Sequence, residues 1–126
     1  MKQINLIYVI EDDPITQYLM EQHFSFYPAI QSVLYFDNGA LALESLKKNT
    51  IPDLIFLDLN MPIMDGWEFL DAIQDNTIFR SIPIYVMTSS INKNDETRAA
   101  NYPSVQGYHT KPFNEEVIQL IIGNRQ

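Results

Sequence analysis

Carboxylate side chains stand at the ends of two apolar runs that have the length of β-strands. Glu11 and Asp12 follow one run, and Asp58 closes another. Lys111 follows a third stretch of this kind. Because the carboxyl ends of parallel strands form the ligand crevice of an open α/β sheet, we expect three acids and one lysine to meet at one sheet edge.

Such a cluster needs a compensating charge, because carboxylates a few ångströms apart cannot all stay ionised at neutral pH. A divalent cation removes the conflict. Ligation by oxygen alone, without His or Cys, suits Mg²⁺, and Mn²⁺ would also fit. A bound metal would attract a phosphate-bearing donor, leaving Asp58 as nucleophile and Lys111 as a second cation for phosphoryl oxygens. Thr88 ends a fourth strand-like run and adds a hydroxyl at the same edge.

Five apolar runs of strand length alternate with segments long enough for helices. The runs cover residues 4–10, 33–36, 54–57, 84–87 and 107–110. This alternation implies right-handed crossovers and a parallel sheet covered on both faces. We therefore expect an α/β fold, a doubly wound three-layer sandwich built from five βα units.

Caps and apolar stripes predict the five helices. The first begins behind the cap Asp13, and Ile15, Leu19 and Phe26 keep its apolar stripe until Pro28 stops the helix. The fourth offers only two alanines as apolar anchors, so we expect it to be the least firmly packed element and the easiest to move. The helices after the first are expected at residues 40–48, 66–76, 94–101 and 114–123.

The last helix carries two apolar stripes. We expect Val117, Leu120 and Ile121 to face the core. The second stripe, Ile118 and Ile122, is either extra core or part of a face for a partner or for self-association.

Three aromatic or imidazole side chains need no part in the chemistry. His23 and His109 each lack a second ligand at useful spacing, so surface or partly packed roles are expected. Trp67 follows the Asp65-Gly66 turn and is expected to be half exposed near the site, where its fluorescence could report binding.

The bulk composition limits the class of protein. With 126 residues and 46% hydrophobic content, the chain fits one domain, residues 1–126, with a single core. Its net charge of −8 lacks the footprint of direct nucleic-acid binding, and the absence of cysteine excludes disulfides and thiolate metal sites. The N-terminal apolar run is too short for a signal sequence or a membrane span, so we expect a cytoplasmic protein.

Four sets of motifs, ordered along nearly the whole chain, identify a resemblance to response-regulator receiver domains, and in particular to stand-alone chemotaxis-type regulators. They are Val9-Ile10-Glu11-Asp12-Asp13-Pro14, Leu57-Asp58-Leu59-Asn60-Met61-Pro62 with Met64-Asp65-Gly66, Met87-Thr88-Ser89, and Gly107-Tyr108-His109-Thr110-Lys111-Pro112-Phe113. The resemblance implies a flavodoxin-like sheet of five parallel strands in the order 2-1-3-4-5, with five helices.

By this resemblance Asp58 accepts a phosphoryl group from a sensor histidine kinase or a phosphotransfer protein. Asp58 and Asp12 bind Mg²⁺, Glu11 contributes through water, and the backbone carbonyl of Asn60 supplies a further ligand. The chain would then be a signalling protein of a two-component phosphorelay rather than an enzyme, catalysing only its own phosphorylation and dephosphorylation.

The resemblance also implies a switch. Thr88 and Lys111 grip the phosphoryl group, and Tyr108 turns inward when Thr88 moves. The Lys111-Pro112 bond is expected to be cis. The altered surface of helix 4, strand 5 and helix 5 would carry the signal to an unknown downstream protein or to a second copy of the chain, as a phosphorylation-dependent homodimer.

The sequence departs from the commonest receiver pattern in three places. The acidic pair is Glu-Asp rather than Asp-Asp, which leaves Asp12 intact, and Ser89 stands where alanine is frequent. Tyr102-Pro103-Ser104-Val105 replaces the familiar Gly-Ala step, so the end of helix 4 and its partner surface are open.

Three alternatives remain at this point. A Mg²⁺-dependent phosphohydrolase would usually carry a second Asp two residues after the nucleophile, where this chain has Asn60. A flavodoxin-like cofactor binder would need a phosphate loop after the first strand, where Glu11-Asp12-Asp13 would repel a phosphate. The third is a receiver fragment of a larger hybrid kinase or regulator.

Overall fold

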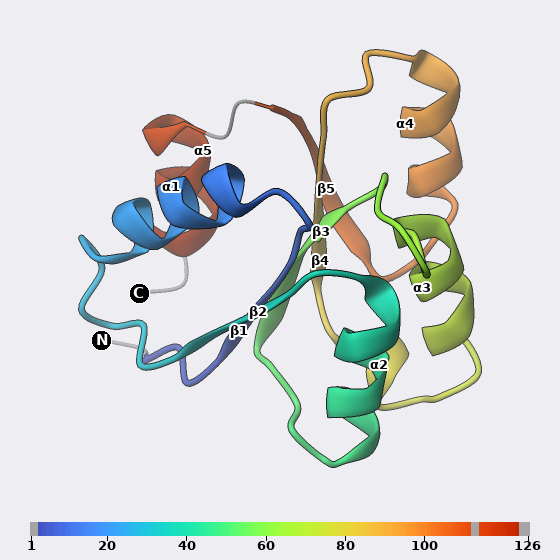
Figure 1. The fold of residues 1–126 in the computed structure, drawn as a ribbon, viewed down its shortest axis with the longest axis horizontal. Helices are drawn as coiled ribbons and strands as arrows, with labels where there is room; N and C mark the ends of the chain where they lie inside the picture. The colour runs from blue at the N-terminus through green and yellow to red at the C-terminus, as the bar shows by residue number, and fades with distance from the viewer. Residues whose placement is uncertain (1–2, 112–113, 124–126) are drawn as a thin grey trace.

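The computed structural model describes residues 3–111 and 114–123 and contains one parallel sheet between two layers of helices (Figure 1). The strands are ordered β2-β1-β3-β4-β5, so the predicted flavodoxin-like order is confirmed. Their bounds are β1 Ile7–Ile10, β2 Val33–Phe36, β3 Leu54–Asp58, β4 Ile84–Thr88 and β5 Val105–Thr110.

The helices divide between the two faces of the sheet, a pair on one face and the rest on the other (Figure 1). The first pair is α1 Pro14–Phe24 and α5 Glu115–Ile122. The second set is α2 Gly39–Lys47, α3 Gly66–Ile73 and α4 Lys93–Ala100. A short 3₁₀ helix, Phe79–Ser81, was not predicted. None of the described helices is long and apolar enough to cross a membrane.

The central strands are buried on both faces, as their continuous apolar runs predict. Alternate residues of β1 divide between the two layers: Ile7 and Val9 pack with α1 and α5, whereas Tyr8 and Ile10 pack with α2 and α3. Every residue of β3 is buried, including the carboxylate at its end. The core therefore holds the strand ends, from which the polar residues emerge, in a fixed register.

Side-chain caps set where helices begin. Asp13 accepts hydrogen bonds from the backbone N–H groups of Ile15 and Thr16, which confirms its predicted role as the cap of α1. Asp65 and Glu68 form a reciprocal capping box at the start of α3. These caps fix where the chain turns from a strand end into the next helix.

The apolar stripe predicted for α1 does not face the sheet. Ile15 and Leu19 are 68% and 50% exposed, and Phe26, which lies beyond the end of the helix, is 74% exposed. Met20 and Phe24 face the sheet instead. Both stripes have helical spacing, and the direction in which α1 leaves its cap decides which one the sheet covers. An exposed apolar stripe is the result.

The stripes of α5 are also reassigned. Ile118 and Ile122 are fully buried with Ile121, so the second stripe is core and is not a partner face. Leu120, predicted to face the core, is 58% exposed, and Val117 is partly buried against the core. The reason is again rotational, since α5 packs across the sheet beside α1 and presents its isoleucine-rich side.

Element ends differ from the predictions by a few residues. Ile4 forms only an isolated bridge with Ile30, so β1 starts later than expected. β5 starts earlier than expected, at Val105, and a register irregularity between Ile84 and Tyr85 of the neighbouring strand lies opposite its first residues. The unusual segment 102–105 thus ends in strand rather than loop, and α4 ends at Ala100.

Candidate functional site

The predicted site residues come together because the neighbouring strands β1, β3, β4 and β5 end at one edge of the sheet. Ile10 of β1 pairs in register with Leu57 of β3, so Glu11 and Asp58 follow side by side. Across the next strand Thr88 pairs with Thr110, and the N–H of Lys111 donates to the carbonyl of Thr88 at 2.8 Å. The register of the strands therefore places the predicted carboxylates, hydroxyl and lysine at the same edge of the sheet.

Glu11, Asp12 and Asp58 form a cluster in which one carboxylate oxygen of each lies within 4.8 Å of the others. Glu11 is fully buried and Asp58 is 3% exposed, whereas Asp12 is exposed. Because Glu11 and Asp58 are buried and Asp12 is exposed, a cation could reach the cluster from the solvent on the side of Asp12.

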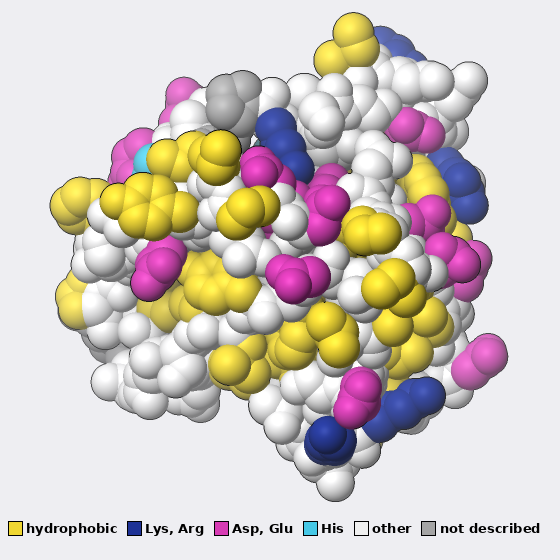
Figure 2. Space-filling view, in the orientation of Figure 1, with side chains coloured by type: hydrophobic (Ala, Val, Ile, Leu, Met, Phe, Trp, Pro, Cys, Tyr) yellow, Lys and Arg dark blue, Asp and Glu magenta, His cyan; other side chains and the backbone are white. Residues whose placement is uncertain are grey.

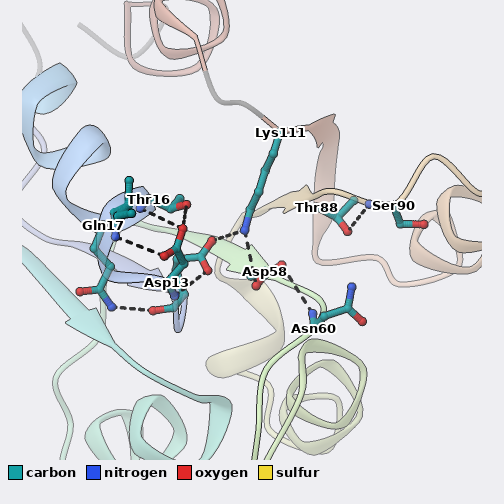
Figure 3. A network of polar contacts seen from close by, with 10 residues as sticks. Asp13, Thr16, Gln17, Asp58, Asn60, Thr88, Ser90 and Lys111 are labelled. Atoms are coloured by element: carbon teal, nitrogen blue, oxygen red, sulfur yellow. Dashed lines mark hydrogen bonds and ion pairs between the residues drawn. The ribbon is translucent and has the colours of Figure 1, made fainter.

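Lys111 is the cation that the structure supplies to this cluster (Figure 3). Its Nζ lies 2.5 Å from Glu11 Oε1 and 3.6 Å from Asp58 Oδ2. One ammonium cannot balance three carboxylates. The space-filling view shows acidic side chains next to and below a cation in the upper part of this face (Figure 2).

Burial dominates the ionisation of the two enclosed acids. It raises the pKa of Glu11 to about 7, against the hydrogen bond from Lys111. Burial likewise raises the pKa of Asp58, with the charge of Lys111 opposing it. Although burial alone lowers the pKa of Lys111, its contacts with Glu11 and Asp58 raise it above its ordinary value. The site is short of positive charge, and an oxygen-coordinated divalent cation fits that need.

The loop after β3 is held close to the site. The N–H of Asn60 reaches Asp58 Oδ1 at 3.5 Å, and Gly66 donates to the carbonyl of Leu59 at 3.0 Å. A Cβ at Gly66 would lie 2.5 Å from the carbonyl oxygen of Asp58, so only glycine permits this approach. Asn60 therefore remains next to Asp58, as its predicted role requires.

Thr88 is fully buried, and its hydroxyl accepts a hydrogen bond from the N–H of Ser90 at 3.1 Å. The Ser90 hydroxyl donates in turn to Asp95 in the first turn of α4, at 2.7 Å. Ser90 was not predicted as a site residue. The signal for it was a small hydroxyl residue two positions after Thr88, just before the Asn92 cap.

Other predicted residues lie farther from the acids. The Tyr108 ring packs against the core with its hydroxyl buried, and this burial raises its pKa. Trp67 is partly buried with Arg98 over its ring, 4.1 Å from the centroid. His23 pairs with Glu115 at 3.0 Å, which links α1 to α5 and takes this histidine out of the acidic cluster.

The predictions for His109 and for the Lys111-Pro112 bond have different outcomes. Burial lowers the pKa of His109, consistent with a partly packed imidazole. The expected cis bond between Lys111 and Pro112 involves a residue outside the described ranges.

Comparisons with known proteins agree with the geometry. The model of the response regulator receiver domain matches residues 7–122. The sensor histidine kinase CheAY of Helicobacter pylori is 34% identical over 86 residues, which cover 68% of this chain but only 11% of the kinase. The aligned part thus represents a small portion of that relative.

Two solved response regulators share the fold. The phosphorylated cyanobacterial phytochrome response regulator RcpA has a TM-score of 0.81 and 28% identity, over 97% of this chain and 90% of RcpA. The Mn²⁺-bound form of response regulator Rcp1 has a TM-score of 0.79 and 27% identity, over 94% of this chain and 89% of Rcp1. With a family model that matches almost its whole length and the sheet order that was expected, this chain belongs to the response regulator receiver domains.

Proposed function

We propose that the protein is a phosphoacceptor of a two-component phosphorelay and that Asp58 carries the phosphoryl group. The observation that supports this most directly is the placement of Asp58: 3% exposed, at the end of β3, within one cluster with two further acids and facing Lys111. In the transfer, an Asp58 oxygen forms a bond to phosphorus while the bond from phosphorus to the donor's histidine nitrogen breaks.

The metal in this proposal is Mg²⁺, with Mn²⁺ able to replace it. Asp12 and Asp58 would bind it directly, Glu11 through water, and Asn60 through its backbone carbonyl. When bound, the metal would offset the negative charge of the carboxylates and of the phosphoryl oxygens of the incoming group. The all-oxygen donor set supports this assignment, as does the Mn²⁺ held by the related Rcp1.

Lys111 and Thr88 act on the phosphoryl oxygens in this scheme. The Lys111 ammonium already reaches toward Asp58 and supplies positive charge where negative charge gathers. Thr88 would exchange its bond with Ser90 for one to a phosphoryl oxygen. Because Ser90 is joined to Asp95, that exchange reaches α4 directly.

The donor is a histidine kinase or a phosphotransfer protein that docks over the site. Exposed aliphatic side chains surround the sheet edge: Ile15 on α1, Ile63 after β3 and Ile91 after β4 are 68%, 82% and 89% exposed. Hydrophobic side chains are also visible over α1 in the space-filling view (Figure 2). Such side chains contribute nothing to the core and suit a protein partner.

The output is a changed surface of α4, β5 and α5, with the Tyr108 ring following Thr88. A downstream protein or a second copy of the chain would recognise this surface. A role as phosphohydrolase is less well supported, because Asn60 cannot act as the acid or base expected two residues after the nucleophile.

The test is phosphorylation by a small phosphodonor. We expect the chain to gain one phosphoryl group by intact mass with acetyl phosphate and Mg²⁺, and none with EDTA or in Asp58→Asn. Asp75→Asn, an exposed acid away from the cluster, is the matched control and should behave as wild type. Phosphorylation that survives Asp58→Asn would refute the assignment. Sedimentation with beryllofluoride decides between self-association and a separate partner.

A further inference from the structure

Gln17, on α1, contacts the segment that carries two of the candidate metal ligands. Its side-chain amide nitrogen donates to the backbone carbonyl of Glu11 at 2.5 Å and to Asp37 Oδ1 at 3.2 Å. An amide nitrogen has two N–H donors, so both are used. Figure 3 shows Gln17 beside Asp13.

The carbonyl that Gln17 holds belongs to the peptide group between Glu11 and Asp12. This group is planar, so fixing its oxygen fixes the plane and the direction in which Asp12 leaves the backbone. On the other side, the N–H of Glu11 donates to the carbonyl of Phe36 at 2.9 Å. Both backbone groups of Glu11 are therefore held: its N–H by the last residue of β2 and its carbonyl by Gln17.

Asp12 needs this support more than its neighbours do. Glu11 and Asp58 are held by burial and by Lys111, whereas Asp12 is exposed. Asp37 directly follows β2, and its bond with Gln17 fixes the rotamer of the glutamine. Groups that orient metal ligands in this way typically change metal affinity when they are removed.

We propose that Gln17 is a positioning residue for the metal site: it holds the Glu11–Asp12 peptide so that the carboxylates of Glu11, Asp12 and Asp58 converge on one cation. This inference rests on the proposed function, since it requires that the acidic cluster binds Mg²⁺. Gln17 itself touches neither the metal nor the phosphoryl group.

The test compares Gln17→Met, which keeps the length of the side chain and removes both donors, with Gln22→Met, an exposed position on the same helix. MgCl₂ is titrated into the metal-free chain by calorimetry, and the Tm is recorded without and with Mg²⁺. We expect Gln17→Met to weaken Mg²⁺ binding about tenfold. The rise in Tm that Mg²⁺ produces should shrink with it, and Gln22→Met should match wild type in both measurements.

A purely structural role gives a different result. It would lower the Tm of the metal-free Gln17→Met protein and leave both the Mg²⁺ affinity and the Mg²⁺-induced rise in Tm unchanged, which would overturn the inference. Gln17→Leu repeats the comparison if the methionine strains the loop. Wild type that does not bind Mg²⁺ would overturn the proposed metal site together with this role, so the two failures are distinguishable.

Discussion

Glu11 makes the stability of the metal-free protein depend on pH. Burial raises the pKa of its carboxyl from an ordinary 4.5 to about 7. The folded protein therefore binds this proton more tightly than the unfolded chain. Consequently the free energy of unfolding should fall as the pH rises from about 4.5 to about 7, by on the order of 1–3 kcal/mol. The raised pKa of Asp58 acts in the same direction.

Urea denaturation in EDTA at a series of pH values between 5 and 8 measures this loss. Glu11→Gln carries no titrating group and should flatten much of the profile. Excess Mg²⁺ should flatten it too, because metal favours the ionised carboxylates. A wild-type protein whose stability rises over this range would contradict the prediction.

Ile63 carries backbone strain that the fold does not need. Its φ is 69°, in the left-handed region where a β-branched residue is an outlier, and its side chain is 82% exposed. Ile63→Gly should relieve this strain and stabilise the protein by about 1 kcal/mol, measured by urea denaturation. Asn49, with a φ of 67°, is the matched control, because asparagine tolerates this region and Asn49→Gly should change little.

The same variant separates strain from partner binding. If Ile63 contacts the donor protein, Ile63→Gly should slow phosphotransfer from a histidine kinase and leave phosphorylation by acetyl phosphate unchanged. A glycine variant that is less stable than wild type would show that the Ile63 side chain makes contacts worth more than the strain.

Among the five described α-helices, α4 has the fewest buried residues. Ala99 is its one buried residue. The helix is held on its outer side by Arg98 over the Trp67 ring and by Tyr102, whose hydroxyl donates to Asp71 at 2.5 Å. These contacts tie α4 to α3 across the surface. Partly exposed cation–π contacts contribute about 0.5–1 kcal/mol, enough to bias a loosely packed helix.

Arg98→Ala should therefore loosen α4. We expect faster amide hydrogen exchange over residues 93–100 and a shift of tryptophan emission, since Trp67 is the single tryptophan of the chain. Lys93→Ala, at an exposed position of the same helix, should leave both signals as in wild type. Protection of α4 equal to that of β3 in the Arg98→Ala protein would show that the helix is anchored in another way.

The strands could be predicted from the sequence better than the orientation of the helices. The strands and their edge were predictable because continuous apolar runs such as 54–57, alternating with helix-length segments, are typical of strands buried on both faces. The rotation of α1 was not, since Ile15 and Leu19 have the same helical spacing as Met20 and Phe24. Only the packed sheet decides between the two stripes.

Some residues of the site could likewise be predicted from the sequence and others could not. Glu11, Asp58 and Lys111 were found because they stand directly at strand ends, where register places them. Gln17 and Ser90 were missed although they lie six and two residues from Glu11 and Thr88, because the course of the loop after each strand decides whether such a side chain turns back to the strand end.

At the scale of the whole molecule, the acidic cluster lowers the stability of the metal-free protein, although the proposed function requires it. The chain has a net charge of −8, and the two buried acids share one lysine at the edge of its only described sheet. A buried carboxylate without full compensation costs free energy, which a neutral residue of the same shape recovers. Asp58→Asn should therefore stabilise the metal-free protein by on the order of 1 kcal/mol, while removing the phosphoacceptor.

Urea denaturation in EDTA and in Mg²⁺ tests this opposition. In EDTA, Asp58→Asn should unfold at higher urea than wild type. In Mg²⁺ the difference in urea midpoint between the two proteins should become smaller or change sign, because wild type binds the metal more tightly in its folded state. Binding stabilises a folded protein by about 2.7 kcal/mol when the ligand concentration is 100 Kd. Asp12→Asn is the control: this carboxylate is exposed, so its loss should weaken the response to Mg²⁺ and leave stability in EDTA nearly unchanged. If Asp58→Asn lowers stability in EDTA, the Lys111 contact outweighs the cost of burial, and the cluster is a structural ion pair before it is a metal site.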